Sequence, residues 1–207
     1  MSTTGIDTTG LGPGEATDLG RRARKKAATR AAISDAALRL FLDRGYRAVS
    51  IKDIADAADV AVTTVFQHFP SKEALVFDKN DEIRRSLVAA VTDREPEQPV
   101  LDALEQWALH TRVVRAADDP AFQQFKKFVR ETEELNTYWR QLWSGHGDAL
   151  AEALLEASRG RSWQLTPATA HSLAHTVLDT CDLARGTDEP APVITEVFDL
   201  IRGGWPH

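Results

Sequence analysis

Residues 50–69 are the part of the chain that most restricts its possible folds. Two short amphipathic helical patterns lie on either side of a tight turn, Asp59-Val60-Ala61. Ser50 is typical of a helix N-cap, and Asp53, three residues later, completes a shortened capping box. Alanine at positions 55, 57 and 58 lets the two helices approach closely. The arrangement predicts a helix-turn-helix, a motif whose second helix lies in the major groove of DNA.

The second helix of this motif is expected to run from Val62 to Phe69, with Val65, Phe66 and Phe69 as its apolar side. Threonine hydroxyls bond base edges or phosphates, glutamine pairs with adenine, and methyl groups contact thymine. We therefore expect DNA contacts from the short or amide side chains that the helix exposes, namely Val62, Thr63, Thr64, Gln67 and His68.

The remaining pattern predicts an all-α fold. Apolar residues at helical spacing from Ile33 to Phe41 mark a first helix, which ends at Gly45 because glycine takes the left-handed conformation without strain. A cap followed by proline starts later helices at Asp119-Pro120 and Thr166-Pro167. We expect an N-terminal three-helix domain followed by a larger helical domain, with about nine helices in total. The longer helices are expected at about 72–93, capped by Ser71, and at about 100–117, 120–134, 136–158, 167–185 and 192–202.

The charges divide the chain into a basic first part and an acidic second part. Residues 21–85 hold 14 Lys/Arg against 9 Asp/Glu, residues 86–207 hold 11 against 19, and the formal net charge is −6. The basic part suits nucleic acid, which the acidic part would repel. We expect a disordered tail and basic arm over residues 1–26, of which the arm is 21–26, a helix-turn-helix DNA-binding domain over 27–72, and a second helical domain over 73–207. Whether the arm contacts DNA or is only a solvated helix entry stays open.

The motif resembles the DNA-binding domain of TetR-family repressors. The matching residues include Ile33, Gly45-Tyr46, Ser50-Ile51-Lys52-Asp53-Ile54-Ala55 and Val65-Phe66-Gln67-His68-Phe69-Pro70-Ser71-Lys72-Glu73-Ala74-Leu75. The resemblance covers residues 27–80, and it is specific because many positions agree at fixed spacing. Beyond them it extends only to length and helical character.

The resemblance implies a role for each matched position. Ser50 and Lys52 would touch the DNA backbone or the groove edge, and Lys72 would hold a phosphate. Three positions depart from the family pattern: Phe66 replaces the usual tyrosine, Ala61 removes the usual side-chain cap, and Asp59 replaces the usual turn glycine. The predicted DNA-binding residues are Ser50, Lys52, Val62, Thr63, Thr64, Phe66, Gln67, His68 and Lys72.

For residues 73–207 the resemblance implies an effector-binding and dimerisation domain. Apolar and aromatic walls with a few polar groups are typical of small-molecule sites. The pocket candidates are Trp107, His110, Phe125, Tyr138, Trp139, Trp143 and Cys181, although an aromatic row at helical spacing is also what a core helix shows. The last two helices carry apolar faces that suit a four-helix dimer interface or the core of one chain. The interface candidates are Leu173, Val177, Val197, Phe198 and Ile201.

One histidine constellation suggests a metal. His171, His175 and Asp179 follow one another at intervals of four, so they can share a helical face that binds Zn²⁺. Position 172 is serine, so the metalloprotease sequence with glutamate there is absent. Histidines satisfied in the core or at an interface are the simpler interpretation. We predict no metal, no cofactor and no catalytic residue, and a metal enzyme built on residues 100–207 is kept as an alternative.

Together these patterns predict a transcriptional regulator of double-stranded DNA. The leading hypothesis is a homodimeric repressor that releases a palindromic operator when it binds a small hydrophobic or aromatic effector. The alternative is an effector-independent activator or architectural protein. The single cysteine, the lack of an apolar run near the ~20 residues that span a bilayer, and an N-terminus without an apolar signal region predict a cytoplasmic protein with no membrane partner.

Overall fold

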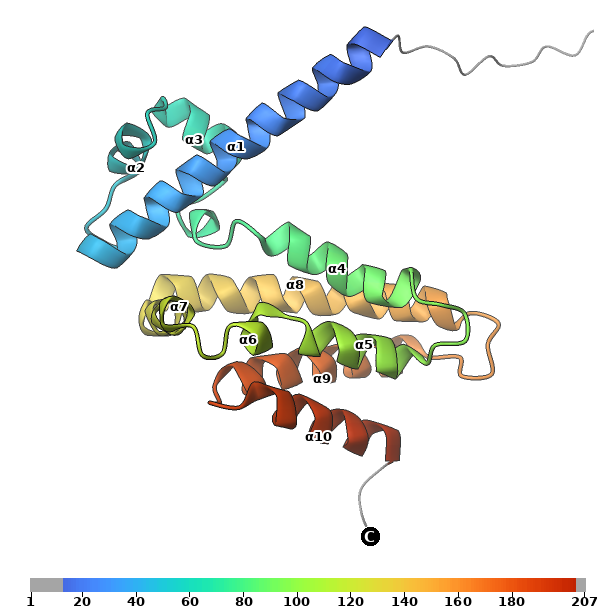
Figure 1. Ribbon diagram of the computed structural model, residues 1–207. Helices are drawn as coiled ribbons and strands as arrows, with labels where there is room; N and C mark the ends of the chain where they lie inside the picture. The colour runs from blue at the N-terminus through green and yellow to red at the C-terminus, as the bar shows by residue number, and fades with distance from the viewer. Residues whose placement is uncertain (1–12, 204–207) are drawn as a thin grey trace, which may run out of the picture. The chain divides into compact units, whose positions relative to one another are not determined.

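The computed structural model describes residues 13–203, and in this range it contains ten α-helices, one short 3₁₀-helix and no strand (Figure 1). The expected all-α fold is confirmed. The chain forms two compact units, Met1–Asp78 and Lys79–His207. Among the described residues, none of the helices combines the length and apolar character that crossing a membrane would require.

The first unit contains a long helix followed by the two short helices of the motif. Its elements are α1 (Pro13–Arg44), α2 (Ile51–Ala57), α3 (Val62–His68) and the 3₁₀-helix η1 (Glu73–Leu75). Gly45 follows α1 with φ +86°, as expected for a residue that ends a helix in the left-handed conformation. The buried apolar residues of this unit include Ile33, Ala37, Phe41, Ile54, Val65, Phe69 and Leu75.

Helix α1 begins earlier than the sequence analysis predicted. Residues 13–26, expected to end the disordered tail and form a basic arm, are helical, while residues 1–12 of that tail lie outside the described range. Alanine, arginine and lysine fill positions 21–28 and are among the best helix formers. The basic arm is therefore part of α1.

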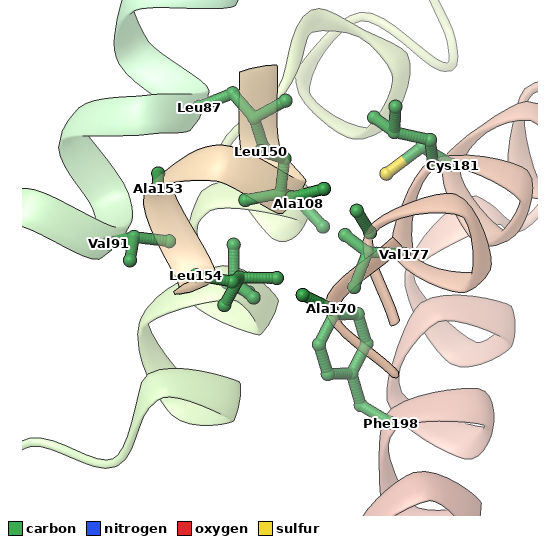
Figure 2. Packing of buried hydrophobic residues seen from close by; sticks show 14 of the residues in the cluster. Leu87, Val91, Ala108, Leu150, Ala153, Leu154, Ala170, Val177, Cys181 and Phe198 are labelled. Atoms are coloured by element: carbon green, nitrogen blue, oxygen red, sulfur yellow. The ribbon is translucent and has the colours of Figure 1, made fainter. Parts of the chain in front are cut away.

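The second unit is a bundle around one core. Its elements are α4 (Asn80–Thr92), α5 (Val100–Leu109), α6 (Arg112–Arg115), α7 (Pro120–Glu131), α8 (Glu133–Ser158), α9 (Pro167–Arg185) and α10 (Pro190–Gly203). Figure 2 shows the centre of this core, where Leu150 and Leu154 of α8 meet side chains from four other helices. The contributing residues include Leu87, Val91, Leu104, Ala108, Ala170, Ala174, Val177, Leu178, Cys181 and Phe198.

The expected cap-then-proline starts are confirmed. Asp119 accepts a hydrogen bond from the Ala121 amide at 2.9 Å, next to Pro120. Thr166 forms a capping box with Thr169, and Pro167 occupies the first turn of α9. Both signals could be identified from sequence because all of their atoms lie within four residues.

Two helices differ from the sequence prediction. The helix expected from residue 72 begins at Asn80, because the Ser71 hydroxyl instead accepts the Ala74 amide and caps the short η1 turn. The helix expected over 100–117 is interrupted after α5. There the Thr111 hydroxyl donates to the Ala108 carbonyl at 2.7 Å and competes with the helical backbone hydrogen bonds.

His146 is a buried polar residue in α8. His146 is 2% exposed, and its ring lies 5.3 Å from that of Trp143. Neither ring nitrogen has a hydrogen-bond partner of ordinary geometry among the described residues. Burial and then the Arg84 guanidinium lower the pKa of His146 to about 4, while the Asn80 backbone and Asp81 oppose this shift. The folded state therefore keeps this imidazole neutral.

This histidine predicts a loss of stability in acid. Unfolded His146 takes up a proton near its ordinary pKa of 6.5, whereas the folded residue does so only near pH 4. The stability that it contributes is therefore present above pH 6.5 and disappears as the pH falls to 4, by roughly 3 kcal/mol. His146→Leu should flatten the dependence of the unfolding free energy on pH over this range, as measured by urea titrations. An unchanged pH dependence in His146→Leu would show that another group causes the loss.

Candidate nucleic-acid interface

The start of α2 is fixed by hydrogen bonds between Ser50 and Asp53. The Asp53 amide donates to the Ser50 hydroxyl at 3.1 Å, and the Ser50 amide donates to the Asp53 carboxylate at 2.8 Å. The Ser50 hydroxyl also donates to that carboxylate at 2.6 Å. These hydrogen bonds lower the pKa of Asp53. The Ser50 side chain, predicted to touch DNA, is thus engaged in the capping box that the sequence indicated.

The turn after α2 contains a strained residue. Asp59 has φ +52°, in the left-handed region that glycine adopts more easily. Its amide donates to the Asp56 carbonyl, and the Val60 amide donates to the Ala55 carbonyl at 3.0 Å, so the end of α2 is satisfied. Asp59, which replaces the usual turn glycine, is therefore the residue that must adopt a positive φ.

Helix α3 presents one face to the core and the other to solvent. Val65 and Phe69 are each 1% exposed, whereas Val62 is 37% and Phe66 is 55% exposed. Phe66 was predicted on the apolar side, and this is wrong: it lies on the outer face. The outer face also carries exposed Thr63 and Gln67, and Thr64 and His68 are half-buried. Ala61 occupies the N-cap without a side-chain hydrogen bond, as the sequence indicated.

Arg30 of α1 holds the end of α3, a role that the sequence analysis missed. Its guanidinium donates to the His68 carbonyl, lies 4.1 Å from the centre of the Phe69 ring, and pairs with the Asp78 carboxylate. A cation there also complements the negative end of the α3 dipole. The available signal was the position of Arg30, three residues before Ile33 on the buried face of α1.

The basic part of α1 and the end of α3 line one groove. Its volume is 380 Å³, and it is lined by Arg22, Lys25, Lys26, Thr29, Gln67 and His68. Burial, followed by the charges of Lys26 and Arg30, lowers the pKa of His68, while Asp78 opposes the shift. The Nδ1 atom of His68 is buried, and residues 13–203 offer it no hydrogen-bond partner. The structure thus brings the predicted basic arm beside two predicted recognition residues.

Two predicted phosphate ligands already have partners in the protein. Lys52 pairs with Asp56 one turn along α2, and this raises the pKa of Lys52. The Lys72 ammonium donates to the Tyr46 carbonyl and lies 4.2 Å from the centre of the Tyr46 ring. Lys72 thus connects η1 to the end of α1 within the protein.

The pocket candidates fall into separate groups in the second unit. Trp107 and His110 line a 310 Å³ groove beside α4 and α5, together with Ala89, Ala90, Asp93, Arg94, Gln98, Ala103 and Gln106. The Trp107 indole donates to the Ser86 hydroxyl of α4 at 3.0 Å. None of the other five pocket candidates belongs to the lining of this groove.

Those five candidates lie on α7, α8 and α9. Trp139 and Trp143 stack with their ring centres 4.5 Å apart and donate to Asp182 and the Leu178 carbonyl of α9. Phe125 stacks on Phe122, and Tyr138 is half-buried. Cys181 lies in the core at 2% exposure, and burial raises the pKa of its thiol to about 12.

Two of the interface candidates are also corrected. Val177 and Phe198 are completely buried in the core of the chain itself, so they have no surface to offer a partner (Figure 2). Leu173, Val197 and Ile201 are half-buried. Leu183 of α9, which the sequence analysis did not select, is 60% exposed.

A capped helix-turn-helix whose outer helix carries exposed polar residues beside a basic groove defines a DNA-binding transcription regulator. The family model of bacterial regulatory proteins, tetR family, matches residues 33–78. The transcriptional repressor Rv3405c of Mycobacterium tuberculosis is 33% identical over 141 residues, which cover 67% of this chain and 73% of that protein. The chain belongs to the TetR family of transcriptional regulators.

Two further proteins extend the comparison. The transcriptional repressor KstR2 of Rhodococcus jostii is 31% identical over 134 residues, which cover 58% of this chain and 64% of that protein. The structure of the regulator FadR from Bacillus subtilis in complex with stearoyl-CoA is similar with a TM-score of 0.50 at 19% identity, and covers 84% of this chain and 98% of that one. At this low identity, the similarity to FadR shows a shared fold only.

The uncapped start of α3 predicts a stabilising substitution. Ala61→Ser adds a side-chain acceptor at the N-cap for the amides of the first turn, which should stabilise α3 by about 1 kcal/mol. Amide hydrogen exchange at the buried Val65 should slow about fivefold. The matched variant Ser50→Ala removes the capping box of α2 and should speed exchange at Ile54 by a similar factor. Unchanged exchange in Ala61→Ser would show that the serine side chain does not cap the helix.

Proposed function

We propose that this protein is a ligand-responsive repressor that binds a palindromic operator as a homodimer. The observation that carries the proposal is the outer face of α3, with exposed Thr63, Phe66 and Gln67, next to the basic groove of α1. Polar side chains on such a helix read base edges, and the lysines and arginines attract phosphates. The names of Rv3405c and KstR2 as repressors support the direction of regulation.

We propose different roles for the two walls of the groove. Gln67 on α3 is exposed and suited to bonding adenine or a neighbouring phosphate. Lys25 and Lys26 on α1 are exposed and line the groove, so they are proposed to neutralise phosphates. His68 is proposed to stay neutral in this basic setting and to present a hydrogen-bonding nitrogen rather than a charge.

Homodimer formation is proposed because one helix-turn-helix reads only one half-site. The surface apolar residues of the last two long helices suit a symmetric contact. Leu183 is exposed on α9, and Leu173, Val197 and Ile201 are half-buried on α9 and α10. Such a pair of helices from each of two chains forms a four-helix interface.

The groove between α4 and α5 is the proposed effector site. Alanines 89, 90 and 103 and the Trp107 ring supply apolar walls, while Arg94 and His110 supply groups for an anionic or polar end. These features suit an amphipathic hydrophobic molecule. The FadR complex with stearoyl-CoA suggests a long-chain acyl-CoA as the first probe.

The DNA proposal predicts a salt-dependent effect of Lys26. Footprinting on the DNA upstream of the protein's own gene should reveal a protected inverted repeat with half-sites about 34–36 Å apart. Lys26→Ala should weaken binding to this site and to scrambled DNA alike, and reduce the slope of log affinity against log salt by about 0.9 for each lost phosphate contact. Lys127→Ala, an exposed lysine of α7, is the matched control and should leave the slope unchanged. Equal slopes for Lys26→Ala and the parent protein would show that Lys26 does not contact a phosphate.

The effector proposal predicts that DNA binding and response can be separated. Stearoyl-CoA should release the parent protein from its operator in a mobility-shift assay. Trp107→Ala should require at least a tenfold higher stearoyl-CoA concentration for release, because it removes an apolar wall of the groove. Without ligand, its affinity for the operator should stay within about threefold of that of the parent protein. Phe125→Ala, outside the groove, is the control. If stearoyl-CoA releases both variants equally, the α4–α5 groove is not its site, and if it releases none, the acyl-CoA class is rejected.

A further inference from the structure

We propose that Asp148, His171 and His175 form a site for a divalent transition-metal ion that connects α8 to α9. One potential ligand atom from each residue lies within 4.8 Å of those of the other two. His171 Nδ1 is 3.8 Å from an Asp148 carboxylate oxygen, and the two imidazole centres are 4.2 Å apart. The sequence placed both histidines on one face of a helix, but Asp148 comes from another helix.

The position of His175 supports the site. Its Nε2 atom is buried and makes no hydrogen bond within the described part of the chain. A Cβ built on Gly147 would lie 2.9 Å from Nε2 and Cε1 of this ring, so the imidazole packs directly on the α8 backbone. Glycine at position 147 thus leaves room for the ring beside Asp148, and a metal would satisfy the nitrogen that the protein leaves unpaired.

The helices hold the two histidines in register. His171 and His175 are one turn apart on α9, which begins at the Thr166 capping box. Ala170 and Ala174, their immediate neighbours in sequence, have no exposed surface and fix α9 in the bundle core. The backbone on both sides of the proposed site is therefore anchored, while Asp148 and His171 are exposed and free to adjust.

The chemistry of the ligand set indicates the class of ion. Two imidazoles and one carboxylate bind Zn²⁺ at about 2.0–2.2 Å and leave a fourth, tetrahedral position for water. To reach those distances, the ligand atoms must approach one another by roughly 1 Å. Rotation of the exposed Asp148 and His171 side chains allows this approach. Imidazole nitrogens favour Zn²⁺, Co²⁺, Ni²⁺ or Cu²⁺ over Mg²⁺ and Ca²⁺. The acidic balance of residues 86–207 also favours a cation.

Asp179 provides a matched control. The sequence placed it on the same face as the histidines, one turn beyond His175, but it is not among the three clustered residues. Asp148→Asn and Asp179→Asn remove the same charge from exposed positions on neighbouring helices. Only the first removes a proposed ligand. In the same way, His110→Ala controls for His171→Ala, since both histidines are exposed.

The test uses tag-free, full-length protein with Zn²⁺ and Co²⁺ as probes and no DNA. Calorimetry should find one Zn²⁺ per chain, Co²⁺ should produce a visible absorption band that Zn²⁺ abolishes, and Zn²⁺ at a hundredfold excess over Kd should raise Tm by about 5 °C. Asp148→Asn and His171→Ala should each weaken binding at least tenfold, while Asp179→Asn and His110→Ala stay within twofold. Binding that the cluster variants leave unchanged, or an absence of binding, overturns the site. Since the assay contains no operator, this outcome is independent of the proposed repressor function.

Discussion

The close packing of α9 on α8 is the contact on which the rest of the second unit depends. Ala170 and Ala174 are fully buried, and such small side chains allow two helices to approach closely. Across this contact, Trp143 of α8 donates its indole N–H to the Leu178 carbonyl of α9 at 3.1 Å, so a large aromatic side chain is held with its polar atom paired. Helices α4, α5 and α10 then bury their apolar faces against this pair (Figure 2).

In the first unit, the main structural requirement is to hold a very short helix, α3, in one orientation. Helix α3 has seven residues, too few to be stable alone in water. Its position depends on burying Val65 and Phe69 and on the Arg30 guanidinium at its last carbonyl. Because α1 supplies that arginine and continues into the basic segment, one helix both supports the recognition helix and lines the groove beside it.

Local features of this fold could be predicted from the sequence, and features that depend on distant residues could not. Gly45, the Ser50 cap and the Thr166-Pro167 start each depend on atoms a few residues apart, and the structure contains all three. The contact of Arg30 with His68 spans 38 residues. Asp148 joins the two histidines only because α8 packs on α9, so helical periodicity within α9 selected Asp179 instead. For the same reason, an apolar stripe on α9 or α10 did not reveal that Val177 and Phe198 face the core of their own chain.

The two sides of helix α4 lie in different surroundings. Leu87 and Val91 are buried in the core, whereas Ala89 and Ala90 line the groove that also contains Trp107. Helix α4 is also the first element after the DNA-binding unit in the chain. A typical allosteric coupling is about 1–3 kcal/mol, and a single hydrogen bond such as that from Trp107 to Ser86 contributes about 1 kcal/mol. A ligand that replaced this bond and a few apolar contacts would therefore suffice to shift α4. The small alanines in this wall reduce the packing that such a shift must break, and for this reason we propose α4 as the element that responds to a ligand in the groove.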